Sequence, residues 1–261
     1  MAFNNILKSI ISDFSEDKSN FLYISLPKQL IEETPDLLKD TSFSVINLTR
    51  NFAPIKPFMQ ILKECNPSEE IINQNSYSLQ QETIQEYLLN GKAKERRDFI
   101  NHEEVFFEKT RITQTVSTII RNLCDKNYVI QNAQELSIEA IEIIKSLEKH
   151  RFCRKIIFCF DNEKTENSST ELQAFIDEKH KQNNFYEITS NEKFKTKELS
   201  INESIPTFDI LYNSLRDCRL LFSLDQGKTL SKWIISNIDS LIFSKKQKCL
   251  IYFERSLLWF E

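Results

Sequence analysis

Apolar residues gather in short continuous runs near the start of the chain and again in its middle. The runs at 21–26 and 155–161 are almost unbroken, which is typical of strands that are buried on both faces of a sheet. Shorter β-prone runs predict further strands at 43–48, 128–130 and 185–189. Pro27 ends the first run, because proline cannot donate a hydrogen bond to a neighbouring strand.

Between these runs, apolar residues recur at the spacing of an amphipathic helix. The spacing predicts helices over residues 1–15, 28–40, 58–65, 112–123, 138–147 and 172–176. Ser137 is expected to cap the helix that follows it. Ser168 and Glu171 form an S-x-x-E capping box, which we expect to open the next helix.

Alternation of strand and helix is the arrangement that builds a parallel sheet. We therefore predict an α/β fold with three layers, in which helices flank both faces of a parallel sheet. The predicted α/β domain covers residues 1–189 and contains a helical insert at about 67–126. A polar linker is expected at 190–205, and an all-helical segment at 206–261 resembles the start of a helical-repeat array.

The last predicted helix ends on Trp259 and Phe260. Large aromatic side chains that stand exposed at the end of a helix favour contact with another surface. We expect either a continuation of the chain or a protein partner to cover them.

Glycine is nearly absent from the chain. Gly91 and Gly227 are its two glycines, whereas average usage is roughly 7%. The phosphate-binding loops G-x-x-x-x-G-K-[ST] and G-x-G-x-x-G need glycines within a few residues of one another, so neither loop is present. The bias of an AT-rich genome explains most of the depletion, and we interpret the missing loop as lost function.

Charge and cysteine content describe an ordinary globular protein. Charged residues make up 28% of the chain and the formal net charge is −4, without the basic surplus typical of nucleic-acid binding. Six cysteines are scattered without a C-x-x-C pair and are expected to be reduced thiols. We expect no signal peptide and no membrane span, since no apolar stretch approaches about 18 residues, and hence a cytoplasmic protein.

Three stretches carry a resemblance to a known family. They are residues 21–33 (FLYISLPKQLIEE), 45–62 (VINLTRNFAPIKPFMQIL) and 128–147 (YVIQNAQELSIEAIEIIKSL). In order and pattern they resemble the first strand, the second strand and the Walker B region of an ASCE-type P-loop NTPase. Residues 21–189 look like a divergent member of the STAND group of signal-transducing ATPases, which are related to the AAA+ class.

The resemblance places a vestigial phosphate loop at Ser25, Lys28 and Gln29. A working loop supplies a lysine to the phosphates and a Ser/Thr hydroxyl to Mg²⁺. Lys28 could be the remnant lysine, but Gln29 replaces the hydroxyl. Pro27 also removes a backbone N–H from a loop that should present such groups.

At the Walker B position, Gln131 and Asn132 stand where the family has carboxylates. Amides carry no negative charge to hold Mg²⁺. Glu135 could replace them only if the turn folds back. Asp161 and Asn162 end the next strand, where active relatives sense the nucleotide, although a capping or solvated role for Asp161 is the simpler interpretation.

Other candidate chemistry is weak. His150, Cys153 and Cys159 suggest a metal set, but a strand of six residues spans about 20 Å, so the two cysteines cannot share an ion. A basic cluster is interpreted as a solvated helix face, with nucleic-acid contact as the alternative; it consists of Lys92, Lys94, Arg96 and Arg97. We expect no metal and no cofactor.

These observations predict a catalytically inactive NTPase-like scaffold or regulatory module, which acts through protein contact in signalling or transcriptional regulation. One alternative is a clamp-loader-like structural subunit of DNA replication. Another is a weakly active ATPase that uses Lys28 and Glu135. Nucleotide binding separates the last alternative from the first.

Overall fold

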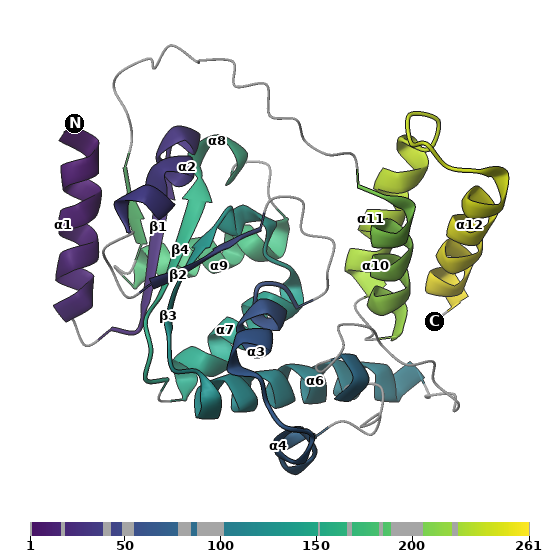
Figure 1. Cartoon of the computed structure of the whole chain (residues 1–261), viewed down its shortest axis with the longest axis horizontal. Coiled ribbons are helices and arrows are strands. Elements are labelled where there is room, and N and C mark those ends of the chain that lie inside the picture. The colour runs from purple at the N-terminus through teal and green to yellow at the C-terminus, as the bar shows by residue number, and fades with distance from the viewer. Residues whose placement is uncertain are drawn as a thin grey trace. The chain divides into compact units, whose positions relative to one another are not determined.

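Figure 1 shows the computed structural model of the chain. It describes residues 2–16, 19–38, 43–48, 55–77, 85–87, 102–150, 152–165, 169–182, 185–188, 206–220 and 224–260. The chain divides into two compact units. Unit 1 contains residues 1–51, 56–65 and 120–193, and unit 2 contains residues 52–55, 66–119 and 194–261. Most of the insert expected at 67–126 thus groups with the C-terminal helices, and the linker expected at 190–205 lies outside the described residues.

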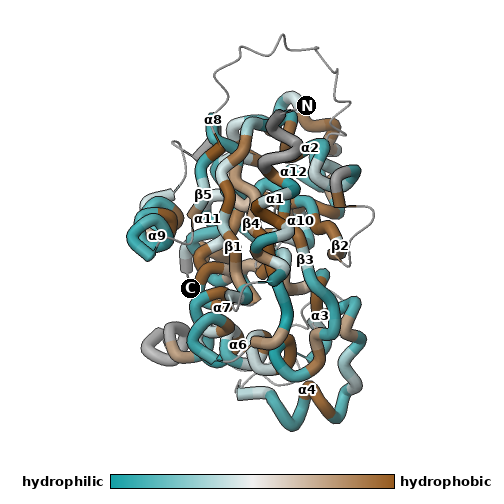
Figure 2. Tube along the Cα trace, turned by 90° about the vertical axis from the view of Figure 1, so that its left-hand side faces the viewer, coloured by the Kyte–Doolittle hydropathy of each residue, from teal (hydrophilic) through white to brown (hydrophobic). Residues whose placement is uncertain are grey.

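Unit 1 is built on a five-stranded parallel sheet. Its strands are β1 (Phe21–Leu26), β2 (Phe43–Asn47), β3 (Asn127–Gln131), β4 (Ile156–Asp161) and β5 (Phe185–Glu187). They lie in the order β2-β3-β4-β1-β5, and every pair is parallel. β1 and β4 are buried along their whole length, as their unbroken apolar runs predict, and Figure 2 shows hydrophobic positions concentrated along them. The predicted α/β fold with a parallel sheet is confirmed.

Helices cover both faces of this sheet. Those of unit 1 are α1 (Ala2–Glu16), α2 (Lys28–Leu37), α3 (Phe58–Cys65), α7 (Ile138–Lys149), α8 (Asn162–Thr165) and α9 (Thr170–Lys181), together with the 3₁₀ turn η1 (Ala133–Glu135). On one face, side chains of α1 and α2 pack with Leu22 and Ile24 of β1. On the opposite face, Tyr23 contacts Phe175 of α9 and bonds to Glu148 of α7, because neighbouring residues of a strand point to opposite sides.

A buried ion pair holds α7 and α9 to the sheet. Lys179 is 1% exposed, and its Nζ lies 2.6 Å from Glu148 Oε2. The other carboxylate oxygen accepts a hydrogen bond of 2.6 Å from the Tyr23 hydroxyl. Burial and the neighbouring Glu148 charge raise the pKa of Tyr23 well above its usual value, so this hydroxyl stays a donor.

Of the two helix caps predicted from the sequence, the structure confirms one. Ser137 accepts a hydrogen bond from the Ala140 amide and caps α7 as predicted. The capping box predicted at Ser168 is wrong, because the cap of α9 is Ser169, whose hydroxyl accepts from the Leu172 amide. Two adjacent serines precede this helix, and only the one whose hydroxyl reaches the third helical amide can cap it.

Unit 2 is helical in its described part. It contains α4 (Glu69–Asn75), the first part of α6 (His102–Leu123), α10 (Phe208–Leu220), α11 (Leu224–Ser236) and α12 (Lys245–Phe260). The last three pack around a shared apolar cluster, which confirms the helical segment predicted after residue 206. Inside it, Arg219 Nε lies 3.0 Å from Glu254 Oε2, and both side chains are buried.

Gly227 lies in α11 against side chains of both α10 and α12. A Cβ atom there would meet Leu258 Cδ2 at 2.7 Å and Cys218 Cβ at 3.0 Å. Both distances are shorter than ordinary carbon contacts of about 3.5–4.0 Å. The end of the Leu258 side chain can move aside, whereas Cys218 Cβ is fixed to its helix, so a side chain at this position crowds α10. No left-handed turn is involved.

We expect Gly227→Ala to lower the free energy of unfolding of unit 2 by up to about 2 kcal/mol, because overpacking of about 1–3 kcal/mol exceeds the roughly 1 kcal/mol of helix propensity that alanine gains. Thr229→Ala, at an exposed position of the same helix, should stay within about 0.5 kcal/mol of wild type. Urea unfolding followed by circular dichroism measures both. A Gly227→Ala protein more stable than wild type would contradict the packing account.

Candidate functional site: the carboxyl edge of the sheet

The candidate site is the edge of the sheet at the carboxyl ends of β1 and β4. α2, which follows β1, packs on one face of the sheet, whereas α9, which follows β4, contacts the other face. In open parallel sheets, ligands bind at the carboxyl ends of strands where successive connections diverge in this way. The pairing of Leu26 with Asp161 brings these two ends together.

The connection from β1 to α2 is a single residue. β1 ends at Leu26 and α2 begins at Lys28, with Pro27 between them in an extended conformation (φ −57°, ψ 142°). The Pro27 carbonyl already accepts the Leu30 amide at 2.9 Å. A phosphate cradle needs several backbone N–H groups that face a common point, and one proline supplies none.

The two predicted loop residues after Pro27 lie in the first turn of α2. The Lys28 side chain is half exposed, and its Nζ is 4.0 Å from Glu32 Oε1 one turn later. Gln29 is partly exposed beside it. An exposed i,i+4 ion pair is worth about 0.3–0.5 kcal/mol, so Lys28 behaves as a solvated residue of the helix surface.

Ser25 is buried at the end of β1 and belongs to a closed set of hydrogen bonds. Its hydroxyl donates to Asn162 Oδ1. Asn162 Nδ2 then donates to the Ile188 carbonyl at 3.0 Å, and the Ile188 amide donates to the Ser25 carbonyl at 3.0 Å. The three residues join the ends of β1, β4 and β5.

Gln131 and Asn132 bind protein groups on either side of β3. Gln131 is buried, and its Nε2 donates to the Ile31 carbonyl of α2. Asn132 has left-handed backbone angles (φ 58°, ψ 44°). Its Nδ2 donates to Asn47 Oδ1 at 2.9 Å, which links the ends of β2 and β3.

Asp161 is buried at the end of β4, where its Oδ1 accepts the Glu163 amide at 3.0 Å and caps the short helix α8. Its own amide donates to Gln134 Oε1 at 3.0 Å. Gln134 Nε2 continues to Asn132 Oδ1 at 3.2 Å. Glu135 is exposed at the end of η1.

The structure thus brings the six predicted positions to one edge of the sheet, on β1, α2, β3 and β4 and in the turn between β3 and η1. They are Ser25, Lys28, Gln29, Gln131, Asn132 and Asp161. Sequence reasoning missed Gln134 and Asn47, which complete the set. The sequence carries a signal for both residues, because each is an amide at, or within a few residues of, the end of a predicted strand.

Besides the Ser25 hydroxyl and the buried Asp161 carboxylate, the polar side chains at the strand ends are neutral amides, most of which bind one another or the backbone. Glutamine and asparagine side chains both donate and accept, so they can satisfy each other without a counter-ion. In the part of the chain that the structure describes, no three His, Cys, Asp or Glu side chains lie close enough to hold a metal ion. The basic cluster at 92–97 lies outside the described residues.

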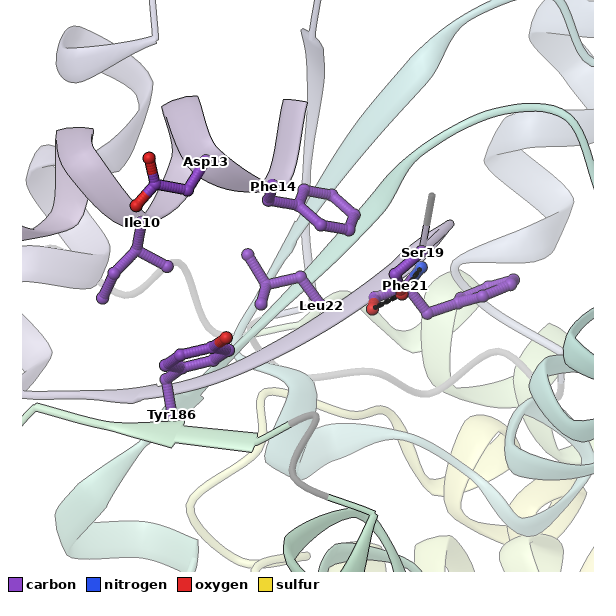
Figure 3. Close-up of a pocket in the computed structure, with 7 residues that line it drawn as sticks. All are labelled: Ile10, Asp13, Phe14, Ser19, Phe21, Leu22 and Tyr186. Carbon is purple, nitrogen blue, oxygen red and sulfur yellow. Dashed lines mark hydrogen bonds between the residues drawn. The ribbon is translucent and has the colours of Figure 1, made fainter. Parts of the chain in front are cut away.

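A small cavity of about 170 Å³ lies elsewhere, at the opposite end of β1 (Figure 3). Side chains of α1, β1 and β5 line it, and Asp13 is its one charged residue. Ligand pockets for drug-sized molecules measure about 300–1,000 Å³, so this cavity is small for a cofactor.

Comparisons with protein-family models, with curated proteins and with solved structures found no match to this chain. Among the helices that the structure describes, none combines the length and the apolar character needed to cross a membrane.

Gln131→Glu tests whether this edge accepts a carboxylate. A buried carboxylate facing the Ile31 carbonyl loses a hydrogen bond and is desolvated, so we expect a loss of about 2–3 kcal/mol at pH 7. Desolvation raises the folded-state pKa of the new group above its unfolded value of about 4.3. Stability should therefore approach that of wild type below about pH 4 and fall as the pH rises through the folded-state pKa.

The matched control is Gln114→Glu on the exposed side of α6, which should change stability by less than about 0.5 kcal/mol. Urea unfolding of both variants between pH 4 and pH 8, each compared with wild type at the same pH, gives the profile. Equal stability of the Gln131→Glu variant at both ends of this range would show that the edge is open to water.

Proposed function

We propose that unit 1 is an NTPase-like α/β module that has lost its nucleotide chemistry and serves as a scaffold or regulatory element, acting in the cytoplasm through protein contact in signalling or transcriptional regulation. The observation that carries the proposal is the one-residue connection at Pro27. It leaves the first strand and first helix in the order expected of the STAND and AAA+ class but without the phosphate loop between them.

The order of the strands supports the class part of the proposal. The strands alternate with helices and lie in the order β2-β3-β4-β1-β5 in an all-parallel sheet, which is compatible with the pattern on which the resemblance rests. The vestigial positions also lie at or beside the strand ends where the resemblance places the nucleotide. These similarities concern the topology alone. In this proposal, the amides at the edge explain why the nucleotide chemistry is lost.

The chemistry of the edge favours an inactive module over a weakly active ATPase. That alternative needs Lys28 to reach a triphosphate and Glu135 to activate water. Lys28 projects from a helix that starts directly after Pro27, and Glu135 is exposed on η1. Gln131, the residue nearest the missing carboxylate pair in the family pattern, is turned to the Ile31 carbonyl.

The protein-contact part rests on aromatic side chains of α12. Phe253 is 58% exposed and Trp259 is 56% exposed. Lys228 Nζ lies 5.4 Å from the centre of the Trp259 ring, so the ring is held at the surface by a cation–π contact. Exposed aromatic residues with restrained geometry are frequent anchors in protein interfaces.

Mg-ATP at about 5 mM is expected to raise the melting temperature by less than about 1 °C. A site with a dissociation constant a hundredfold below that concentration would stabilise the protein by about 2.7 kcal/mol, which is a shift of roughly 5–10 °C for a protein of this size. Differential scanning fluorimetry of the full chain measures the shift.

Two lysine variants decide the meaning of any shift that is seen. Lys28 and Lys145 are similarly exposed, and each is paired with a glutamate on its own helix. A shift that Lys28→Ala abolishes and Lys145→Ala retains would show a working nucleotide site and overturn the proposal. A shift that both variants retain comes from binding elsewhere and leaves this edge of the sheet without a nucleotide.

For protein contact, we expect the double variant Phe253→Ser/Trp259→Ser to lose proteins that the wild-type chain captures by chemical crosslinking in cells. Loss of interface aromatics costs about 2 kcal/mol or more each, so capture should fall at least tenfold. Tyr186→Ser in unit 1, where the ring is 45% exposed, is the matched control and should capture the same proteins as wild type. If both variants captured the same proteins as wild type, α12 would not be the contact surface.

A further inference from the structure

Two cysteines meet where the chain leaves unit 1 for the helical insert and where it returns. Cys65 is the last residue of α3, and Cys124 directly follows α6. Unit 1 contains residues 56–65 and resumes at residue 120. The two thiols are within hydrogen-bonding contact of each other, although they lie far apart in the sequence.

Side-chain bonds hold the two segments together around the thiols. Glu64 Oε2 accepts Lys126 Nζ at 3.3 Å and the Tyr128 hydroxyl at 3.2 Å. Arg154 Nε donates to the Cys124 carbonyl at 3.3 Å. These contacts join the residue before Cys65 to Lys126 and Tyr128, and the turn before β4 to Cys124, so they hold the end of α3 beside the segment that contains Cys124.

We propose that Cys65 and Cys124 are a redox-active thiol pair, which hydrogen peroxide converts to a reversible disulfide that closes the insert at its base. The pair is reduced in the structure, where all six cysteines are free thiols. Cys65 is partly exposed and Cys124 is 8% exposed, so a small oxidant suits the site better than a bulky one.

The two thiols have different surroundings. The hydrogen bond from Cys65 lowers the pKa of Cys124, and the charge of Arg154 acts in the same direction. That same hydrogen bond, together with burial, raises the pKa of Cys65. Cys124 Sγ also donates to the Lys126 carbonyl at 3.4 Å, which is a bond of the neutral thiol, and Cys65 is the more exposed of the two. The first attack is therefore open to either sulfur, and the other thiol resolves the product.

The two steps conserve atoms and electrons. One of the two sulfurs, as a thiolate, attacks one oxygen of hydrogen peroxide, the O–O bond breaks, and the products are a sulfenic acid and hydroxide. The sulfur of the other cysteine then attacks the oxidised sulfur, the S–O bond breaks, and the hydroxyl leaves as water with the proton of the second thiol. The protein loses two electrons in total, and the peroxide gains them.

The experiment treats the full chain with hydrogen peroxide and maps its disulfides by mass spectrometry without reduction. We expect a peptide that joins Cys65 to Cys124, a mass decrease of about 2 Da relative to the reduced chain, and full reversal by dithiothreitol. Because the link closes residues 66–123 into a loop, the melting temperature should rise by several degrees, on the order of 5–10 °C.

Variants separate this pair from the other cysteines. Cys153→Ser removes an exposed thiol of the same unit and should keep the linked peptide, whereas Cys65→Ser should abolish it. The mapping of wild type and of Cys153→Ser suffices even where Cys65→Ser does not fold. Free or irreversibly oxidised Cys65 and Cys124 in those two proteins, or a link that joins either cysteine to another partner, would overturn the proposal.

Discussion

The pairing of β1 with β4 is the interaction on which the rest of unit 1 depends. Six residues of each strand are in register, from Phe21 with Ile156 to Leu26 with Asp161, and both strands are buried throughout. A shift of one residue would turn every side chain to the opposite face. Tyr23 would then lose Glu148, and Ser25 would lose Asn162. The same register sets Pro27 and Asn162 side by side, and so fixes the composition of this edge of the sheet.

Amides at this edge have a structural consequence. A pair of carboxylates at buried strand ends repel each other and are costly to desolvate unless a cation joins them. Gln131, Asn132 and Gln134 carry no charge, and each finds a protein partner within its reach. Their bonds link the ends of β2, β3 and β4 and join β3 to α2, beside the buried Asp161 carboxylate that caps α8. A set of bonds of this kind holds the strand ends in a fixed arrangement, which suits the scaffold role proposed above.

The sequence predicted the elements of the sheet well, because unbroken apolar runs such as 155–161 leave few alternatives to a buried strand. It did not predict the order of the strands or the partners of the edge residues, since both depend on contacts between distant segments. The prediction of Ser168 as a helix cap was wrong for a local reason, because two adjacent serines precede the helix and the sequence pattern does not separate them. Gly227 was noticed for its rarity, but its role in helix packing becomes visible only with Leu258 and Cys218 beside it.

Scarcity of glycine raises the question of how this chain makes left-handed turns. Among the described residues, positive φ angles at non-glycine positions occur at Asn66 and Asn132, and asparagine tolerates this region better than most residues do. Asn132 also uses its side chain, which donates to Asn47 across the edge. Glycine at that position would supply the same backbone angle together with empty space for a ligand. Asparagine supplies the angle and adds a side chain that donates to Asn47 and accepts from Gln134, so the turn after β3 is joined to the end of β2 by the protein's own hydrogen bonds.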